Sequence, residues 1–184
     1  MNNQTQSTVH RISPSAARVR LKKLVISGML TALTVALSGF SIPIGASRCF
    51  PMQHLANVLA GVFLGPVYGV SMAFGTSLIR NLLGTGSLLA FPGSMAGAFL
   101  GAVLYRKTGR LLPAYLGEVM GTGLIGGTLC YPVAVLLMGK EVAVFFFVVP
   151  FLLSTAAGTI LAALLLEMLR RLGLFTYLSR LINE

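Results

Sequence analysis

Residues 142–172 read VAVFFFVVPFLLSTAAGTILAALLLEMLRRL, and this stretch decides the fold. A helix that crosses a membrane needs about 20 mostly apolar residues, and the stretch exceeds that length before it reaches its two arginines, Arg170 and Arg171. The whole chain has the same character, because 55% of its 184 residues are hydrophobic and only 10% are charged. Soluble domains have about 25% charged residues. The composition therefore predicts an all-α integral membrane protein.

Glycine, proline and charged residues divide the chain into six apolar stretches. These are residues 21–40, 52–64, 68–83, 92–105, 114–138 and 142–172. The first, fifth and sixth are long enough to cross a membrane alone, whereas the other three are shorter and are rich in glycine or bounded by proline. Short helices need shelter, because unwound backbone is tolerated at membrane depth only inside protein. We therefore expect one bundle of six transmembrane helices, with ordered, half-buried loops at residues 41–51 and 83–91.

The basic residues predict the orientation of this bundle. The net charge is +10, and eleven of the 14 lysines and arginines fall into three clusters. The clusters are Arg11, Arg18, Arg20, Lys22 and Lys23, then Arg106, Lys107 and Arg110, then Arg170, Arg171 and Arg180. Because basic residues are in excess on the cytoplasmic side of membranes, and six crossings place all three clusters on one side, both termini are expected in the cytoplasm. Clusters at membrane ends do not indicate a nucleic-acid partner.

Three parts of the chain follow from this arrangement. Residues 1–20 are expected to form a polar, basic cytoplasmic tail, residues 21–175 a six-helix membrane domain that binds a substrate, and residues 176–184 a cytoplasmic C-terminal end.

Acidic residues are few, and this limits the chemistry. We expect Glu118 and Glu167 near the cytoplasmic ends of their helices and Glu141 in an outer loop. Ion-coupled transport by one chain usually needs a carboxylate or a broken-helix ion site at mid-depth, and none is expected here. The sequence also lacks paired carboxylates, a Ser-His-Asp set and a metalloprotease motif. An enzyme is therefore not expected.

Metal and nucleotide sites are not expected either. The two cysteines, Cys49 and Cys130, and the two histidines, His10 and His54, lack the spacing of a metal site. The GTGS run at residues 84–87 lacks the full nucleotide-binding loop pattern. The thiols are expected to be free and buried, with a disulfide as the alternative.

Polar residues gather before and within the second apolar stretch. Arg48, Gln53, His54 and Asn57 lie there, and polar side chains at membrane depth usually face an interior cavity. His54 and Asn57 are three residues apart and so share one helix face. These residues are therefore candidates for a binding site, and polar capping at the level of the lipid headgroups is the alternative.

A second polar group follows the third apolar stretch. Arg80 and Asn81 precede Gly84 and Gly86, which permit a tight loop whose backbone can approach a ligand. Arg80 as an anchor that extends to the membrane surface is the alternative. Tyr131 could form an aromatic wall of a pocket. Alternatively, it belongs to the aromatic belt at the membrane interface. The predicted substrate-binding residues are Arg48, Gln53, His54, Asn57, Arg80, Asn81, Thr85, Ser94 and Tyr131.

The first apolar stretch has a stripe of small residues. Gly28, Ala32 and Ala36 recur every four residues, and such a stripe lets another helix approach closely. The partner is either a helix of this chain or a separate membrane subunit.

Several motifs together resemble a known family. They are RCFPMQH at 48–54, NVLAG at 57–61, RNLLGTG at 80–86 and FPG at 91–93. This series resembles the ThiW family, substrate-binding S components of energy-coupling factor (ECF) vitamin transporters, over residues 21–172. The resemblance implies a multi-pass protein of the prokaryotic cell membrane that binds a thiamine precursor outside, the thiazole moiety (hydroxyethylthiazole).

The same resemblance implies the partners. A transmembrane coupling protein and two cytoplasmic ATPases would supply the energy. The partner ATPases would therefore use ATP, and this chain itself would bind no cofactor. Small residues on the first helix contact the coupling protein in that family. Gly28, Ala32 and Ala36 match those positions here, although Gly28 departs from a strict alanine pattern.

The residues leave the ligand open. Donors and acceptors without tryptophan or a well-placed carboxylate fit a small, nearly neutral heteroaromatic molecule. Arg48 and Arg80 would repel the positive charge of intact thiamine unless Glu141 folds inward, and they would admit a phosphate ester of the thiazole. The alternatives are an S component for hydroxymethylpyrimidine or thiamine, and a membrane scaffold subunit without a ligand.

Overall fold

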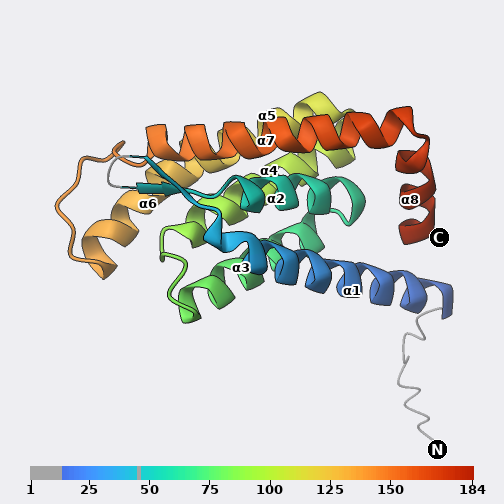
Figure 1. Cartoon of the computed structure of the whole chain (residues 1–184), viewed down its shortest axis with the longest axis horizontal. Helices are drawn as coiled ribbons and strands as arrows, with labels where there is room; N and C mark the ends of the chain where they lie inside the picture. Colours follow the sequence, from blue (N-terminus) through green and yellow to red (C-terminus); the bar gives the residue numbers. More distant parts are fainter. Residues whose placement is uncertain (1–13, 45–46) are drawn as a thin grey trace, which may run out of the picture.

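Each of the six predicted apolar stretches contains a helix. The computed structural model describes residues 14–44 and 47–184. Its long helices are α1 (Pro14–Ala36), α2 (Pro51–Phe63), α3 (Pro66–Leu82), α4 (Ala90–Thr108) and α7 (Val148–Arg171). The fifth stretch forms one continuous run made of α5 (Leu111–Met120), the π-helix η2 (Gly121–Gly126), α6 (Gly127–Pro132) and the π-helix η3 (Val133–Leu137). These helices pack side by side as a bundle (Figure 1).

Three segments are long and apolar enough to cross a membrane. They are Ser15–Gly39, Leu111–Leu137 and Val148–Arg171, which confirms the prediction for the first, fifth and sixth stretches. The 13 residues of α2 are mostly buried between its neighbours, as expected for a short helix that needs shelter. The count of six crossings stays a prediction.

A short β-hairpin accompanies the helices of this otherwise all-helical fold. After the 3-10 turn η1 (Leu37–Gly39), β1 (Ile42–Ile44) pairs antiparallel with β2 (Ser47–Cys49), so that Ile42 lies opposite Cys49. The thiol of Cys49 approaches the carbonyl oxygen of Pro150 at 3.5 Å. This contact attaches the hairpin to the first turn of α7, so the loop at residues 41–51 is ordered partly by strand pairing.

The helical structure extends further at both ends than expected. At one end α1 begins at Pro14 rather than near residue 21. After α7, α8 (Leu174–Asn183) folds across the end of the bundle (Figure 1). Its Ile182 is buried against residues of α2 and α3, and Lys22 Nζ donates a 2.8 Å hydrogen bond to the carbonyl oxygen of Leu181. The helix α8 therefore packs against the start of α1. It also spans the predicted boundary between the membrane domain and the C-terminal end at residue 175.

The three basic clusters come together at this end. Arg106 is close enough to Lys23 to interact with it electrostatically, and Arg170 is similarly close to Tyr105. The helices α4 and α7 run from the other end of the bundle to this one. One end of the molecule is thus strongly basic, which is the pattern that the predicted orientation requires.

Glycines let α4 touch the fifth helical run backbone to backbone. The pairs are Gly93 with Gly126, Gly97 with Gly121, and Gly101 with Gly117. A Cβ added to Gly117 would lie 2.7 Å from the Cα of Gly101, and a Cβ added to Gly121 would lie 2.7 Å from the Cα of Gly97. Small residues at such positions allow close helix packing in membranes. We call these six glycines the glycine seam.

Replacement of a seam glycine should destabilise the protein. Gly117→Ala places a methyl group against the backbone of α4, and overpacking of this kind typically costs ~1–3 kcal/mol. Thermal unfolding in detergent can be followed with a thiol-reactive fluorescent dye, because both cysteines are buried and free. We expect a lower unfolding temperature for Gly117→Ala. Gly28→Ala is the matched control, since nothing lies within 4 Å of a Cβ at Gly28; equal unfolding temperatures for both variants would contradict the close packing.

Candidate functional site

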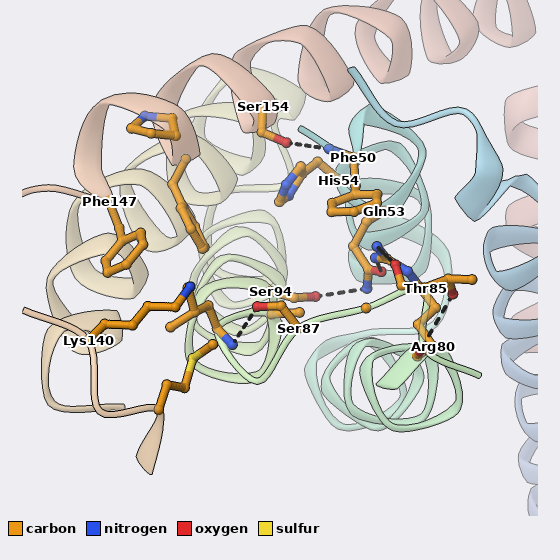
Figure 2. Close-up of a pocket in the computed structure, with 17 residues that line it drawn as sticks. Phe50, Gln53, His54, Arg80, Thr85, Ser87, Ser94, Lys140, Phe147 and Ser154 are labelled. Atoms are coloured by element: carbon orange, nitrogen blue, oxygen red, sulfur yellow. Dashed lines mark hydrogen bonds between the residues drawn. The ribbon is translucent and has the colours of Figure 1, made fainter. Parts of the chain in front are cut away.

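A cavity of about 410 Å³ lies at the end of the bundle opposite α8. Its walls come from the first turns of α2, α4 and α7, from the loop after α3 and from Met138 and Lys140 beyond η3 (Figure 2). Small-molecule sites usually have roughly 300–1,000 Å³ and combine apolar walls with a few polar groups. The cavity fits that description, because Phe50, Phe147 and Phe151 line it together with polar residues.

Arg80 forms one side of the cavity. Its side chain, in the last turn of α3, is only 1% exposed. One terminal nitrogen donates to Gln53 Oε1 at 3.0 Å and the other to the carbonyl oxygen of Thr85 at 3.4 Å. The guanidinium carbon lies 3.8 Å from the ring centre of Phe50. Arg80 therefore points into the protein, and the alternative of an anchor extended to the membrane surface is wrong.

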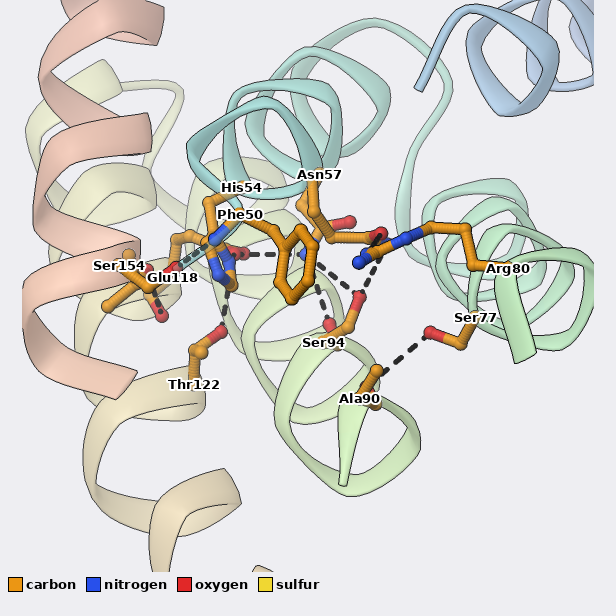
Figure 3. A network of polar contacts seen from close by, with 12 residues as sticks. Phe50, His54, Asn57, Ser77, Arg80, Ala90, Ser94, Glu118, Thr122 and Ser154 are labelled. Atoms are coloured by element: carbon orange, nitrogen blue, oxygen red, sulfur yellow. Dashed lines mark hydrogen bonds and ion pairs between the residues drawn. The ribbon is translucent and has the colours of Figure 1, made fainter. Parts of the chain in front are cut away.

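Gln53, Asn57 and Ser94 link α2 to α4 next to the cavity, and Figure 3 shows Asn57 close to Ser94. Gln53 Nε2 donates to Ser94 Oγ at 2.9 Å. Asn57 Nδ2 approaches both the carbonyl oxygen and Oγ of Ser94, at 3.2 and 3.3 Å. All three side chains are buried, so the polar cluster is an interior network and not a capping group at the headgroup level.

His54 continues this network to Glu118 on α5. The distance between His54 Nδ1 and Glu118 Oε1 is 2.9 Å, and both side chains are buried. The same carboxylate oxygen accepts hydrogen bonds from Asn57 Nδ2 at 3.0 Å and Thr122 Oγ1 at 3.2 Å. With Nδ1 held by the carboxylate, the other ring nitrogen of His54 remains available to a ligand.

The position of Glu118 overturns an expectation from the sequence. We expected this residue near a cytoplasmic helix end and no carboxylate in the binding region, but Glu118 is 1% exposed and contacts His54 directly. Gly97 on α4 has no side chain, and a Cβ added there would collide with Thr122 Oγ1 and the Glu118 carboxylate. The sequence signal that could have indicated this buried role is the single acidic residue, Glu118, within an apolar stretch.

The structure brings most of the predicted site residues together. Gln53, His54, Arg80, Thr85 and Ser94 line the cavity, and Asn57 lies directly beneath it. Asn81 braces the loop instead, because its Nδ2 donates to the carbonyl oxygens of Ser77 and Ser87 at 2.7 and 3.0 Å. Arg48 is in β2, but its side chain lies outside the described part of the chain.

Tyr131 lies apart from the cavity. It is half-buried on α6 and is not among the lining residues. The preceding residue, Cys130, is fully buried, and its thiol approaches the carbonyl oxygen of Leu89 at 3.2 Å. Because successive residues of a helix point about 100° apart, the inward position of Cys130 turns Tyr131 away.

Some lining residues were not predicted from the sequence. Phe50 and Phe147 immediately precede α2 and α7, and Ser154 accepts a 2.9 Å hydrogen bond from the backbone N–H of Phe50. Lys140 also lines the cavity, and it forms no ion pair with the neighbouring Glu141 in the described structure. Phenylalanine, serine and lysine are common in apolar segments and loops, so the sequence alone does not distinguish these lining residues from others of the same type.

Among residues 14–44 and 47–184, no three His, Cys, Asp or Glu side chains come together in a way that could hold a metal ion. Cys49 and Cys130 are free and buried rather than joined in a disulfide.

Comparison with known proteins gives one match. The model of a family described as thiamine-precursor transporter protein (ThiW) matches residues 24–172, which include every residue of the cavity and its network. No curated protein and no solved structure matched the chain.

Loss of the Glu118 carboxylate should destabilise the bundle. Glu118→Ala leaves His54, Asn57 and Thr122 without their shared acceptor, and a buried donor left unpaired costs ~1–3 kcal/mol. We therefore expect a clearly lower unfolding temperature in detergent. Glu167→Ala is the control, because its pair with Arg171 is largely exposed and exposed pairs contribute ~0–1 kcal/mol. If both variants unfold like the wild type, the network does not hold the helices together.

Proposed function

We propose that this chain, which belongs to the ThiW family of thiamine-precursor transporters, is the substrate-binding S component of an ECF transporter and binds the thiazole moiety of thiamine, hydroxyethylthiazole. The observation that carries the proposal is the cavity at the end of the bundle opposite the basic clusters. It combines aromatic rings with buried polar groups, as a site for a small heteroaromatic molecule requires.

The lining supports a small ligand without a positive charge. Phe50 and Phe147 offer apolar rings, whereas His54, Gln53 and Ser94 offer groups for hydrogen bonds. No carboxylate is among the described lining residues, and Glu118 is already engaged by His54. The cation of intact thiamine would therefore face Arg80 without a compensating acid, which favours the thiazole half over thiamine. Hydroxymethylpyrimidine is the second candidate ligand, because it is also small and aromatic.

The energy for import would come from partner subunits. We assign the docking of a transmembrane coupling protein, which works with two cytoplasmic ATPases, to the stripe of Gly28, Ala32 and Ala36. All three are exposed, so the stripe is not packed against the described residues of this chain. Exposed bulky residues such as Met29 and Leu33 lie beside the stripe. A partner helix could thus approach the small residues closely.

The placement in the membrane is part of the same proposal. The chain would lie in the prokaryotic cell membrane, with six crossings within residues 21–175 and with the tail at 1–20 and the end at 176–184 in the cytoplasm. The gathering of the basic clusters at the α8 end supports this orientation. The cavity then opens towards the outside, where a scavenged vitamin precursor is met.

Binding of radiolabelled hydroxyethylthiazole to the purified protein tests the ligand. We expect saturable binding that unlabelled thiazole displaces more strongly than hydroxymethylpyrimidine or thiamine. His54→Ala should raise the dissociation constant roughly five- to hundredfold, since a lost buried hydrogen bond costs ~1–3 kcal/mol. Thr108→Ala, an exposed change at the basic end, is the control. Absence of saturable binding by the folded protein would instead favour a ligand-free scaffold.

A bulky residue in the stripe should separate binding from transport. Ala32→Trp would keep a closely packed partner helix away while leaving the cavity intact. We expect normal thiazole binding by the isolated protein but loss of uptake and of co-purification with the coupling protein. Leu164→Trp, at another exposed apolar position on α7, should preserve both. Normal uptake by Ala32→Trp would show that the coupling protein docks elsewhere.

A further inference from the structure

We propose that the ligand of this cavity carries a negatively charged group, a phosphate monoester, which Arg80 binds. This inference rests on the proposed function, because it refines the chemical class of the thiazole-type precursor. The observation behind it is a buried guanidinium that lines the cavity and has no acidic partner.

The charge of Arg80 is uncompensated in the described structure. The ion pairs there are His54 with Glu118 and Arg171 with Glu167. Arg80 instead contacts the neutral groups of Gln53, Thr85 and Phe50, and its Nε is buried without a partner. A buried charge is strongly unfavourable unless an opposite charge and hydrogen bonds accompany it. An anion in the cavity would supply both.

Glu118 does not take this role. Its Oε1 already accepts hydrogen bonds from His54, Asn57 and Thr122. Hydrogen bonds connect Glu118 to Arg80 only through intervening side chains, which are Asn57, Ser94 and Gln53. Figure 3 shows Asn57 and Ser94 between the carboxylate and the guanidinium.

Arg80 also has donors to spare. A guanidinium has five N–H groups, and the bonds to Gln53 and Thr85 use one hydrogen on each terminal nitrogen. Two such bonds suffice to clamp the loop after α3 to α2. The remaining hydrogen on each terminal nitrogen can be donated to an oxygen of a phosphate or carboxylate.

Three helix N-termini reinforce the positive potential. The N-caps of α2, α4 and α7 are Phe50, Leu89 and Phe147, and all three line the cavity. No acidic residue occupies the first turn of these helices, and helix N-termini favour anions. The C-terminus of α3 is close by, but its last carbonyl groups accept hydrogen bonds from the backbone N–H groups of residues 83–86. The negative end of that helix is thus capped.

The remaining polar groups of the cavity are mainly donors. Ser87 Oγ accepts the backbone N–H of Leu89, so its hydroxyl still has a proton to donate. Lys140 lies on the side of the cavity opposite Arg80 (Figure 2). A phosphate monoester brings about 1.5–2 negative charges and three strong acceptor oxygens. It matches this donor-rich lining better than an alcohol with one oxygen.

The test compares two ligands on the full chain purified in detergent. Calorimetric titration with hydroxyethylthiazole and with its phosphate monoester gives the ratio of their dissociation constants. We expect the ester to bind the wild type at least tenfold more tightly, with an affinity that falls as salt is added. Arg80→Gln should bring the ratio close to one. Arg110→Gln removes the same charge from an exposed position at the opposite end and should preserve the ratio.

The outcomes separate this inference from the proposed function. Equal or tighter binding of the unphosphorylated thiazole by the wild type overturns the inference and leaves the proposed function standing. Failure of both ligands to bind the folded protein overturns both. If Arg80→Gln does not fold, Lys140→Ala, a change to an exposed cavity residue, takes its place. A lower ratio in that variant supports the anionic ligand, and an unchanged ratio together with salt-independent binding contradicts it.

Discussion

Direct backbone contact between α4 and the fifth helical run is the constraint on which the rest of the structure depends. At the glycine seam no side chain separates the two helices, so Glu118 and Thr122 lie immediately behind α4. Ser94 lies on α4 one turn before Gly97, and Asn57 reaches both Ser94 and Glu118. A methyl group at the seam would move α5 outward by displacing backbone, and it would pull the carboxylate away from His54.

That packing makes a continuous polar floor possible inside an apolar bundle. The floor begins at His54 and Glu118 and continues from Glu118 through Asn57 to Ser94, Gln53 and finally Arg80. In surroundings of low polarity each of these hydrogen bonds is strong, and each unpaired group is costly. The floor is therefore rigid. On the other side of the cavity, Met138 and Lys140 make no side-chain hydrogen bonds in the described structure, so the cavity has one fixed surface and one more adaptable surface.

The sequence predicted the helices well and the depth of individual residues poorly. Long apolar runs with glycine and proline at their ends indicate helices whatever their neighbours are, and the polar residues of α2 could be assigned to the interior because polar groups rarely face lipid. The directions of Glu118 and Tyr131 could not be predicted because the direction of a helical side chain depends on which face packs. The π-helical turn η2, which lies between these two residues, shifts that face along the fifth run. The hairpin and α8 depend on contacts with α7, α1 and α2, which a local pattern does not contain.

The cavity and the exposed stripe of α1, for which we propose ligand binding and partner docking, are separate but share one physical connection. The exposed face of α1 lies on the far side of the helix from α3, and Thr31 on α1 approaches Gly75 on α3. Beyond α1, Ser38 Oγ donates to Thr85 Oγ1 at 3.3 Å, and the carbonyl oxygen of Thr85 accepts from Arg80. A subunit that docks on α1 can change ligand affinity only if it prefers one of two arrangements of these contacts. The route from α1 to Arg80 is short and polar, so a movement of Thr85 and its loop relative to α2 would break the hydrogen bond between Thr85 and Arg80.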